Sequence, residues 1–469
     1  MAEQEKTDVP NVFVNRTLNM RKIRFIGLDM DQTLVRYHSN AFYELAYRTF
    51  IQKLVEKRGY PQFLYEFQPN FDSVIRGLII DRKKGNLLKV NRYGWIRKSS
   101  HGTKPIDYAA QLQIYKSVYI DLAEADKYYV VDTAFAIPTA SLFAQLIDLK
   151  DTLNDCSLPD YEIIASDLLA IEGEAHTDGS LKDIIATDIG NFIIRDEAVV
   201  RGLERFRMHG KKFFLLTNSD YKYTKVLLDY AFNPFMKEGK TWEDLFELVI
   251  IGAKKPLFFY EQQPFLRVNP HDGSLNHHEG RLTAGIFQGG NALQLTADFG
   301  LEGEEILFVG DHIYSDIIRL KKSSNWRTAL VLEDLKAEID SYKKALPYMR
   351  EIQSLMREKE PLETALSELV SIKIETGKVV DTEKINQLGA AIHELDVLIG
   401  QMIVKEEALF NPLWGDIMRA GNEESYLANQ TERFACIYMA QLEDFLAESP
   451  RHYFRAVRRP LAHELVLSE

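Results

Sequence analysis

Short apolar runs alternate with helical patterns along much of the chain. The first run, residues 22–28, is rich in β-branched and aromatic side chains and ends at two carboxylates, as expected of a buried strand that opens onto a site. Four similar runs follow, at residues 212–217, 247–252, 306–310 and 328–332. Helical patterns separate them, so we expect a parallel α/β sheet that binds its ligand beyond the carboxyl ends of the strands.

A domain-sized insertion, residues 39–195, separates the first strand from the second. It begins with an amphipathic helix over 41–57 and continues with a meander of short strands over 77–98. Two further helices are predicted within it, over 139–151 and 180–192. The pattern favours an α+β cap domain above the open end of the sheet.

The C-terminal third changes to long, charged helical patterns. Helices are predicted over 333–359, 361–375, 382–410 and 430–448. They indicate either an appendage that packs on the core or a surface for homo-oligomerisation into a dimer or tetramer, because amphipathic stripes look identical in both settings. The predicted division is a core of residues 1–38 and 196–335, a cap of 39–195 and a helical region of 336–469.

The amino-acid composition argues against some classes of binding partner. The 469 residues carry a formal net charge of -12, which repels nucleic-acid backbones and anionic membranes. No stretch approaches the eighteen consecutive apolar residues of a membrane span, and the first ten residues are polar rather than a secretory leader. The two cysteines, Cys156 and Cys436, lie far apart, which suits a reducing compartment. We expect a cytoplasmic protein without nucleic-acid or membrane partners.

Candidate chemistry begins directly after the first strand, at Asp29 and Asp31. Two carboxylates so close together repel each other unless a cation or a shared proton relieves the repulsion. A bound divalent metal is one explanation, and an acidic loop in solvent is the other.

The next two strands end in groups that can bind an anion. Thr217 and Asn218 offer a hydroxyl, an amide and main-chain N–H groups at the start of a helix, although an ordinary helix cap would use the same residue types. Lys255 follows the third strand. Its ammonium group could neutralise both a bound phosphate and the nearby carboxylates, whereas a solvated loop is the common alternative.

The fourth strand ends at a glycine followed by Asp311 and Asp316. Asp311 can reach a metal ion held by Asp29, while Asp316 could hold a metal-bound water or orient Lys255. The intervening His312 is interpreted as structural, because oxygen donors suit magnesium better than imidazole.

Taken together, strand ends carrying DxDxT, TN, K and GDxxxxD in this order resemble the haloacid dehalogenase-like hydrolase superfamily. The resemblance implies a Rossmann-like parallel core, with the insertion as a cap that shields the site. It also implies that Asp29 is the nucleophile and that Asp31 serves as acid and base.

Finer agreement occurs over residues 12–16, 217–224, 255–259 and 310–313. These stretches resemble the purine-preferring cytosolic 5′-nucleotidases (type II), which hydrolyse IMP and GMP. In the cap, the resemblance implies that Phe135 stacks on the purine and that Lys182 contacts the substrate. His176 lies where that family has a histidine. The arginine and aspartate that precede this histidine in the family have no clear counterparts here, which leaves the choice of base open.

The mechanism implied by the resemblance uses Mg²⁺ bound by Asp29, the main-chain carbonyl of Asp31 and Asp311, with Asp316 in a second shell or acting through water. Asp29 attacks phosphorus, Asp31 protonates the departing 5′ oxygen, and water then hydrolyses the aspartyl-phosphate. The phosphoryl group is held by Thr217, Asn218 and Lys255.

Other functions remain open at this point. A nucleoside phosphotransferase or a generic phosphatase of the same superfamily would use the same intermediate. A nucleotide-sensing scaffold belongs to a different class and would be expected to have lost at least one of the catalytic residues. The resemblance also implies activation by a nucleotide such as ATP or GTP.

Overall fold

The computed structural model describes residues 11–116, 119–122, 124, 126–153, 158–377, 381–461 and 463–464. The chain divides into two compact units, of which the first combines Met1–Asp334 with Ala420–Glu469 and the second is Leu335–Arg419. Cys156 lies outside the described residues.

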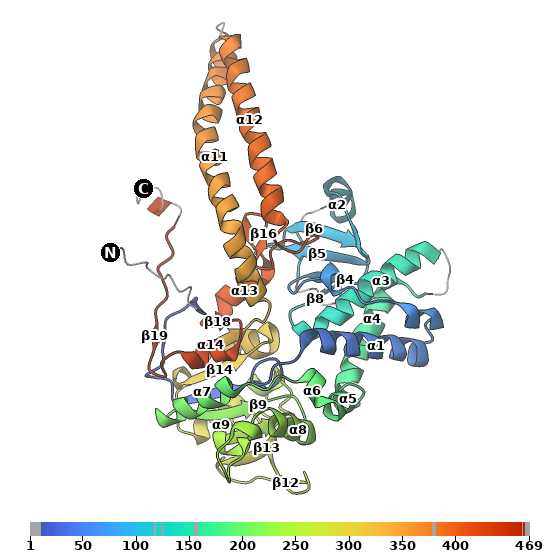
Figure 1. The fold of residues 1–469 in the computed structure, drawn as a ribbon, viewed down its shortest axis with the longest axis vertical. Helices are drawn as coiled ribbons and strands as arrows, with labels where there is room; N and C mark the ends of the chain where they lie inside the picture. The colour runs from blue at the N-terminus through green and yellow to red at the C-terminus, as the bar shows by residue number, and fades with distance from the viewer. Residues whose placement is uncertain are drawn as a thin grey trace. The chain divides into compact units, whose positions relative to one another are not determined.

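A ten-stranded sheet forms the centre of the first unit, in the order β1-β18-β15-β14-β3-β9-β10-β13-β11-β12 (Figure 1). Its strands are β1 (Val12–Val14), β3 (Phe25–Leu28), β9 (Lys212–Leu216), β10 (Leu248–Ile251), β11 (Phe265–Val268), β12 (Leu275–His277), β13 (Gly285–Gly289), β14 (Ile306–Gly310), β15 (Arg327–Val331) and β18 (Ile437–Met439). All neighbours from β18 to β13 pair in parallel, whereas β1 at one edge and β11 and β12 at the other side pair antiparallel with their neighbours. The α/β class and the five predicted strands are confirmed.

The side chains in the middle of this sheet are tightly packed. The strands β3, β10 and β14 are buried along their whole length, as their continuous apolar runs require. Gly27 in β3 lets two aromatic rings from the neighbouring strands meet above it. A Cβ atom at Gly27 would lie 2.2 Å from Cζ of Phe214 and 2.7 Å from Cδ2 of Phe308.

Two helices of the first unit outside the insertion, on either side of β9, begin with well-formed caps. Asp196 caps α7 (Glu197–Met208) by accepting from two main-chain N–H groups, and Asp220 caps α8 (Tyr221–Ala231), which confirms the helix predicted there. The others are α9 (Ala292–Asp298), α10 (Arg319–Ser323), α13 (Tyr426–Phe434) and α14 (Leu442–Ala447).

The insertion folds as an α+β region, as predicted. Its five-stranded antiparallel sheet has the order β7-β6-β5-β4-β8. The strands are β4 (Ile79–Asp81), β5 (Asn86–Val90), β6 (Ile96–His101), β7 (Lys104–Pro105) and β8 (Tyr128–Val130). The helices are α1 (Ser39–Arg58), α2 (Tyr108–Tyr115), α3 (Ile137–Leu153), α4 (Tyr161–Thr177), α5 (Lys182–Thr187) and α6 (Ile189–Phe192). Of these, α1, α3 and α4 pack together beside the sheet (Figure 1).

One helix prediction in this region is wrong. Residues 180–192 form the two short helices α5 and α6 instead of one helix. Asp188 separates them, because its φ of -123° and ψ of 50° are not helical.

The second unit is a hairpin of α11 (Leu335–Thr376) and α12 (Thr382–Glu407), which lie side by side (Figure 1). The helices predicted over 333–359 and 361–375 form the single helix α11, which continues through Pro347 and Pro361. A proline removes one main-chain hydrogen bond at its own position, and packing along a helix of 42 residues sustains the rest. Among the described residues, none of the helices is long and apolar enough to cross a membrane.

The helix predicted over 430–448 is also wrong. The strand β18 interrupts it and pairs with both β15 and β1. Two small pairings complete the chain: β19 (Tyr453–Phe454) with β2 (Leu18–Asn19), and β16 (Arg419–Ala420) with β17 (Glu423–Glu424). Residues from 420 onward thus belong to the unit of the large sheet and not to the helical region predicted over 336–469. The boundaries of the cap remain a prediction.

We expect Gly27→Ala to lower the free energy of unfolding by about 1–3 kcal/mol, because the added methyl group must displace two buried rings. Urea unfolding measures the change. Gly173→Ala in α4 is the matched control, since a Cβ atom there meets no heavy atom within 4 Å, and we expect it to stabilise the helix by about 0.5–1 kcal/mol. An unchanged urea midpoint for Gly27→Ala would contradict this account of the packing.

Candidate active site

A cavity of ≈ 450 Å³ opens at the carboxyl ends of the central strands. The core lines it with Asp29 and Asp31 after β3, Thr217 and Asn218 after β9, Lys255 after β10 and Asp311 after β14. The inserted region lines it with Phe42, Phe135, Glu172, His176 and Lys182. Every predicted site residue except Asp316 lines this cavity. Segments far apart in the sequence therefore meet here, as the parallel sheet requires.

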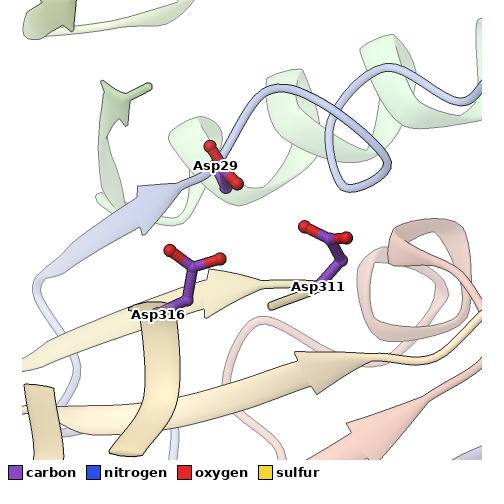
Figure 2. Close-up of side chains that lie close together, drawn as sticks. All are labelled: Asp29, Asp311 and Asp316. Carbon is purple, nitrogen blue, oxygen red and sulfur yellow. The ribbon is translucent and has the colours of Figure 1, made fainter. Parts of the chain in front are cut away.

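Three carboxylates gather at the base of the cavity. Asp29, Asp311 and Asp316 can each place one oxygen within 4.8 Å of the others. Figure 2 shows the three side chains pointing toward one another, Asp29 from the end of β3, Asp311 from the end of β14, and Asp316 from the π-helical turn Ile313–Ile318. All three are buried.

Lys255 supplies the cation of this cluster. Its Nζ lies 2.7 Å from Oδ1 of Asp29 and 2.8 Å from Oδ1 of Asp316. Burial by itself lowers the pKa of Lys255. The charges of the two carboxylates raise this pKa by a larger amount, so it lies above its ordinary value. The ammonium therefore stays charged and bridges the two carboxylates.

One ammonium does not balance three buried carboxylates. Burial raises the pKa of Asp29 well above its usual range, despite the opposing effect of Lys255. Burial, together with the charge of Asp316, raises the pKa of Asp311 to about 7. The cluster therefore lacks positive charge when all three groups are ionised.

The donor set fits a divalent cation that prefers oxygen ligands. Oδ2 of Asp311 is buried and has no hydrogen-bond partner among the described residues. Such an orphaned oxygen is costly unless a cation or donor approaches it. The side chain of Asp31 is directed elsewhere, so its predicted metal contact would use the main-chain carbonyl.

Asn218 fixes the main chain of Lys255. Its side-chain oxygen accepts from the N–H of Lys255 at 2.6 Å, and its side-chain NH₂ donates to the carbonyl of Lys255 at 3.1 Å. The amide was predicted to hold phosphate. The amide oxygen and one hydrogen of the NH₂ group are thus used by Lys255, so the second NH₂ hydrogen and the main-chain N–H of Asn218 are the donors left for a phosphate. Thr217 is fully buried, and its Oγ1 accepts from the N–H of Ser219.

The carboxylate of Asp31 is held by two hydroxyl groups. Tyr37 donates to Oδ1 at 2.6 Å, and Ser219 donates to Oδ2 at 3.0 Å. The hydroxyl of Tyr37 lies 2.9 Å from that of Tyr223. The two tyrosines were not predicted from the sequence, because tyrosine is common in this chain, Tyr37 belongs to no motif, and Tyr223 lies in the matched stretch 217–224 without an assigned role.

The upper wall of the cavity is aromatic. Phe135 makes edge contacts with Phe42 at 4.9 Å, His176 at 5.6 Å and Tyr37 at 6.1 Å between ring centroids. Lys182 lies 3.3 Å from a carboxylate oxygen of Asp220. Its predicted contact with the substrate thus competes with an existing ion pair.

One further group in the cavity lining was missed. Glu172 lies one helical turn before His176 and accepts a hydrogen bond from Oγ1 of Thr139 at 3.0 Å. Burial raises the pKa of Glu172 to about 7. A carboxylate four residues before a cavity histidine on one helix was the available signal. His312, interpreted as structural, lies 3.5 Å from the carboxylate of Asp132.

His176 is neutral near pH 7, because burial and then the charge of Lys182 lower its pKa to about 4. Between pH 6.5, the ordinary pKa of histidine, and pH 4, the unfolded chain binds a proton at His176 that the folded protein does not bind. The free energy of unfolding therefore decreases as pH falls, by about 3 kcal/mol from this group.

We expect His176→Phe to remove this pH dependence. Between pH values of about 7.5 and 4.5 the variant should lose about 2–3 kcal/mol less stability than the wild type, measured by urea unfolding. Equal losses in the two proteins would mean that His176 is not held neutral by its surroundings.

Comparisons with known proteins identify a family for this chain. A family model described as the 5′ nucleotidase family matches residues 12–466. A 5′-nucleotidase domain-containing protein of Dictyostelium discoideum is 26% identical over 475 residues, which cover 98% of this chain and 76% of the relative.

Two solved structures are similar at 12% identity over 66% of this chain. A haloacid dehalogenase-like family hydrolase from Xanthomonas campestris is covered to 82% with a TM-score of 0.25. An archaeal β-phosphoglucomutase from Pyrococcus sp. strain ST 04 is covered to 86% with a TM-score of 0.29. Scores this low add nothing to the fold, which stands on the sheet itself.

The family match runs through the sheet, the insertion and the helical hairpin. It also includes every residue that lines the cavity. The chain belongs to the 5′ nucleotidase family, and it is a phosphoric monoester hydrolase.

Proposed function

We propose that this protein is a magnesium-dependent 5′-nucleotidase that releases phosphate from purine nucleoside 5′-monophosphates. The observation that supports it best is the buried cluster in which Lys255 bridges Asp29 and Asp316 beside Asp311. This cluster joins a nucleophile, a fixed cation and a set of oxygen donors at one end of a cavity that can hold a small molecule.

Asp29 is the proposed nucleophile. It lines the cavity, whereas Asp316 lies behind it and is fully buried. The main-chain N–H of Met30 donates to Oδ1 of Asp29 at 2.8 Å, and Lys255 approaches the same oxygen. These contacts hold the carboxylate in one orientation, which is what in-line attack on phosphorus requires.

Asp31 moves the protons. As Asp29 bonds to phosphorus and the bond to the 5′ oxygen breaks, Asp31 gives a proton to that oxygen. Water then attacks the aspartyl-phosphate, Asp31 takes its proton, and phosphate leaves. Mg²⁺, held by Asp29, Asp311 and the carbonyl of Asp31, would supply positive charge against the phosphate. Lys255 supplies a second positive charge, and Thr217 and Asn218 are the proposed phosphate contacts.

The nucleoside would lie against the wall formed by Phe135 and His176. Aromatic rings offer a surface on which a purine can stack, and the neutral imidazole can donate or accept one hydrogen bond. The preference for IMP and GMP follows from the family resemblance together with this wall. Lys182 is the proposed further contact if it leaves Asp220. Activation by ATP or GTP belongs to the same resemblance, whereas a homo-oligomeric state is proposed from the helical C-terminal pattern and a cytoplasmic location from the composition.

A panel of nucleoside monophosphates tests the proposal. We expect Mg²⁺-dependent phosphate release from IMP and GMP with kcat/KM at least about tenfold above that for UMP, because the larger purine ring buries more surface against the aromatic wall. Excess EDTA should abolish release, and added MgCl₂ should restore it. Asp29→Asn is the matched blank, since its amide keeps the shape of the carboxylate but cannot attack phosphorus.

Each part of the proposal can fail separately. Equal rates for purine and pyrimidine nucleotides would reject the assigned substrate class. Undiminished release in EDTA would reject the metal, and release by Asp29→Asn would reject the nucleophile.

A further inference from the structure

A chain of hydroxyl groups stands behind the carboxylate of Asp31. It joins residues from three places: Tyr37 follows β3 in the chain, Ser219 follows β9, and Tyr223 lies in the first turn of α8. The hydrogen bonds measure 2.6 Å from Tyr37 to Asp31, 3.0 Å from Ser219 to Asp31 and 2.9 Å between the two tyrosines. All three hydroxyl-bearing residues belong to the lining of the cavity.

The direction of the hydrogen bonds between these hydroxyl groups follows from the number of protons that each group can donate. A phenol has one proton, and Tyr37 gives its proton to Oδ1 of Asp31. In the bond between the tyrosines, Tyr223 must therefore be the donor and Tyr37 the acceptor. Because a carboxylate oxygen has about two acceptor positions, one position on each oxygen of Asp31 remains for the reacting groups.

The surroundings keep both phenols protonated and in place. Tyr37 is 2% exposed and Tyr223 is 6% exposed. Burial, and then the charge of Asp31, raises the pKa of each phenol above its ordinary value. The ring of Tyr37 makes edge contacts with Phe42 at 5.6 Å and Phe135 at 6.1 Å. Tyr37 is thus a donor with a fixed position.

We propose that Tyr37, supported by Tyr223, is the positioning residue that aims the carboxyl group of Asp31 in both halves of the reaction. The inference rests on the proposed function, in which Asp31 gives a proton to the departing oxygen and later takes one from water. Tyr37 and Tyr223 keep their own protons throughout. A carboxyl group that can rotate away would serve neither step.

The nature of the leaving group separates this role from a merely structural one. The 5′ oxygen of a nucleoside needs a proton as it departs, whereas p-nitrophenolate leaves without one. Misplacing Asp31 should therefore slow the first step with a nucleotide but spare it with p-nitrophenyl phosphate. The second step, attack by water, should be slow with both substrates.

Rapid-mixing kinetics of Tyr37→Phe test this expectation. With p-nitrophenyl phosphate we expect a burst of p-nitrophenolate at close to the wild-type rate, followed by a steady rate lower by about 10- to 100-fold. With IMP we expect no burst of inosine, a similar loss in kcat and a KM within about threefold of the wild type. Tyr221→Phe on the same helix is the control, because its hydroxyl meets the carbonyl of Pro270 and lies outside the cavity lining.

A double-mutant cycle supplies the second readout. In an Asp31→Asn background, Tyr37→Phe should cause no further loss, because it acts through a group already removed. If Tyr37→Phe does not fold, Tyr223→Phe should show the same burst with a smaller loss, since it removes the supporting donor. The inference is overturned if, with p-nitrophenyl phosphate, the burst rate falls as much as the steady rate. It is also overturned if the losses in rate of the two single variants multiply in the double variant, or if the tyrosine variants behave as the wild type. If the wild-type protein hydrolyses neither p-nitrophenyl phosphate nor IMP, the proposed function itself is wrong.

Discussion

The ion pairs of Lys255 with Asp29 and Asp316 are the interaction on which the site depends. Burying carboxylates is unfavourable, and the chain tolerates it here because parallel strands bring a cation to the same edge. Asn218 holds the main chain of Lys255 from the neighbouring strand end. Gly310 leaves the space that Asp316 fills, since a Cβ atom there would lie 2.4 Å from Oδ2 of Asp316.

The same charges support the proposal that the site binds a metal ion and a phosphate group. Lys255 compensates part of the buried negative charge, and burial together with the charge of Asp316 raises the pKa of Asp311 to about 7. A divalent cation would restore full ionisation of the cluster, and the pair of cations would then attract a phosphate group. The inserted region adds aromatic rings and a neutral His176 at the other end of the cavity. One part of the lining carries the charged groups, and the other is the part against which we propose that the nucleobase lies.

Five of the ten strands of the large sheet and the acidic cluster could be predicted, because these buried parallel strands are continuous apolar runs and their carboxyl ends meet at one edge. What could not be predicted depends on partners that are distant in sequence. The strand at Ile437–Met439 is short and follows a helix, so only its pairing with β15 and β1 reveals it. Tyr37 belongs to no motif, and Tyr223 lies in the matched stretch 217–224 without an assigned role. The use of the Asn218 amide on Lys255 depends on how two loops meet.

The central claim is that Asp29 carries the phosphoryl group during turnover. Acid quenching of the enzyme during turnover of its fastest nucleotide, followed by borohydride reduction, converts an aspartyl-phosphate to homoserine that peptide mass spectrometry can locate. We expect homoserine at position 29 in the substrate-treated enzyme and none without substrate. Phosphate release with no modified residue, or with the modification at another carboxylate, would contradict the account.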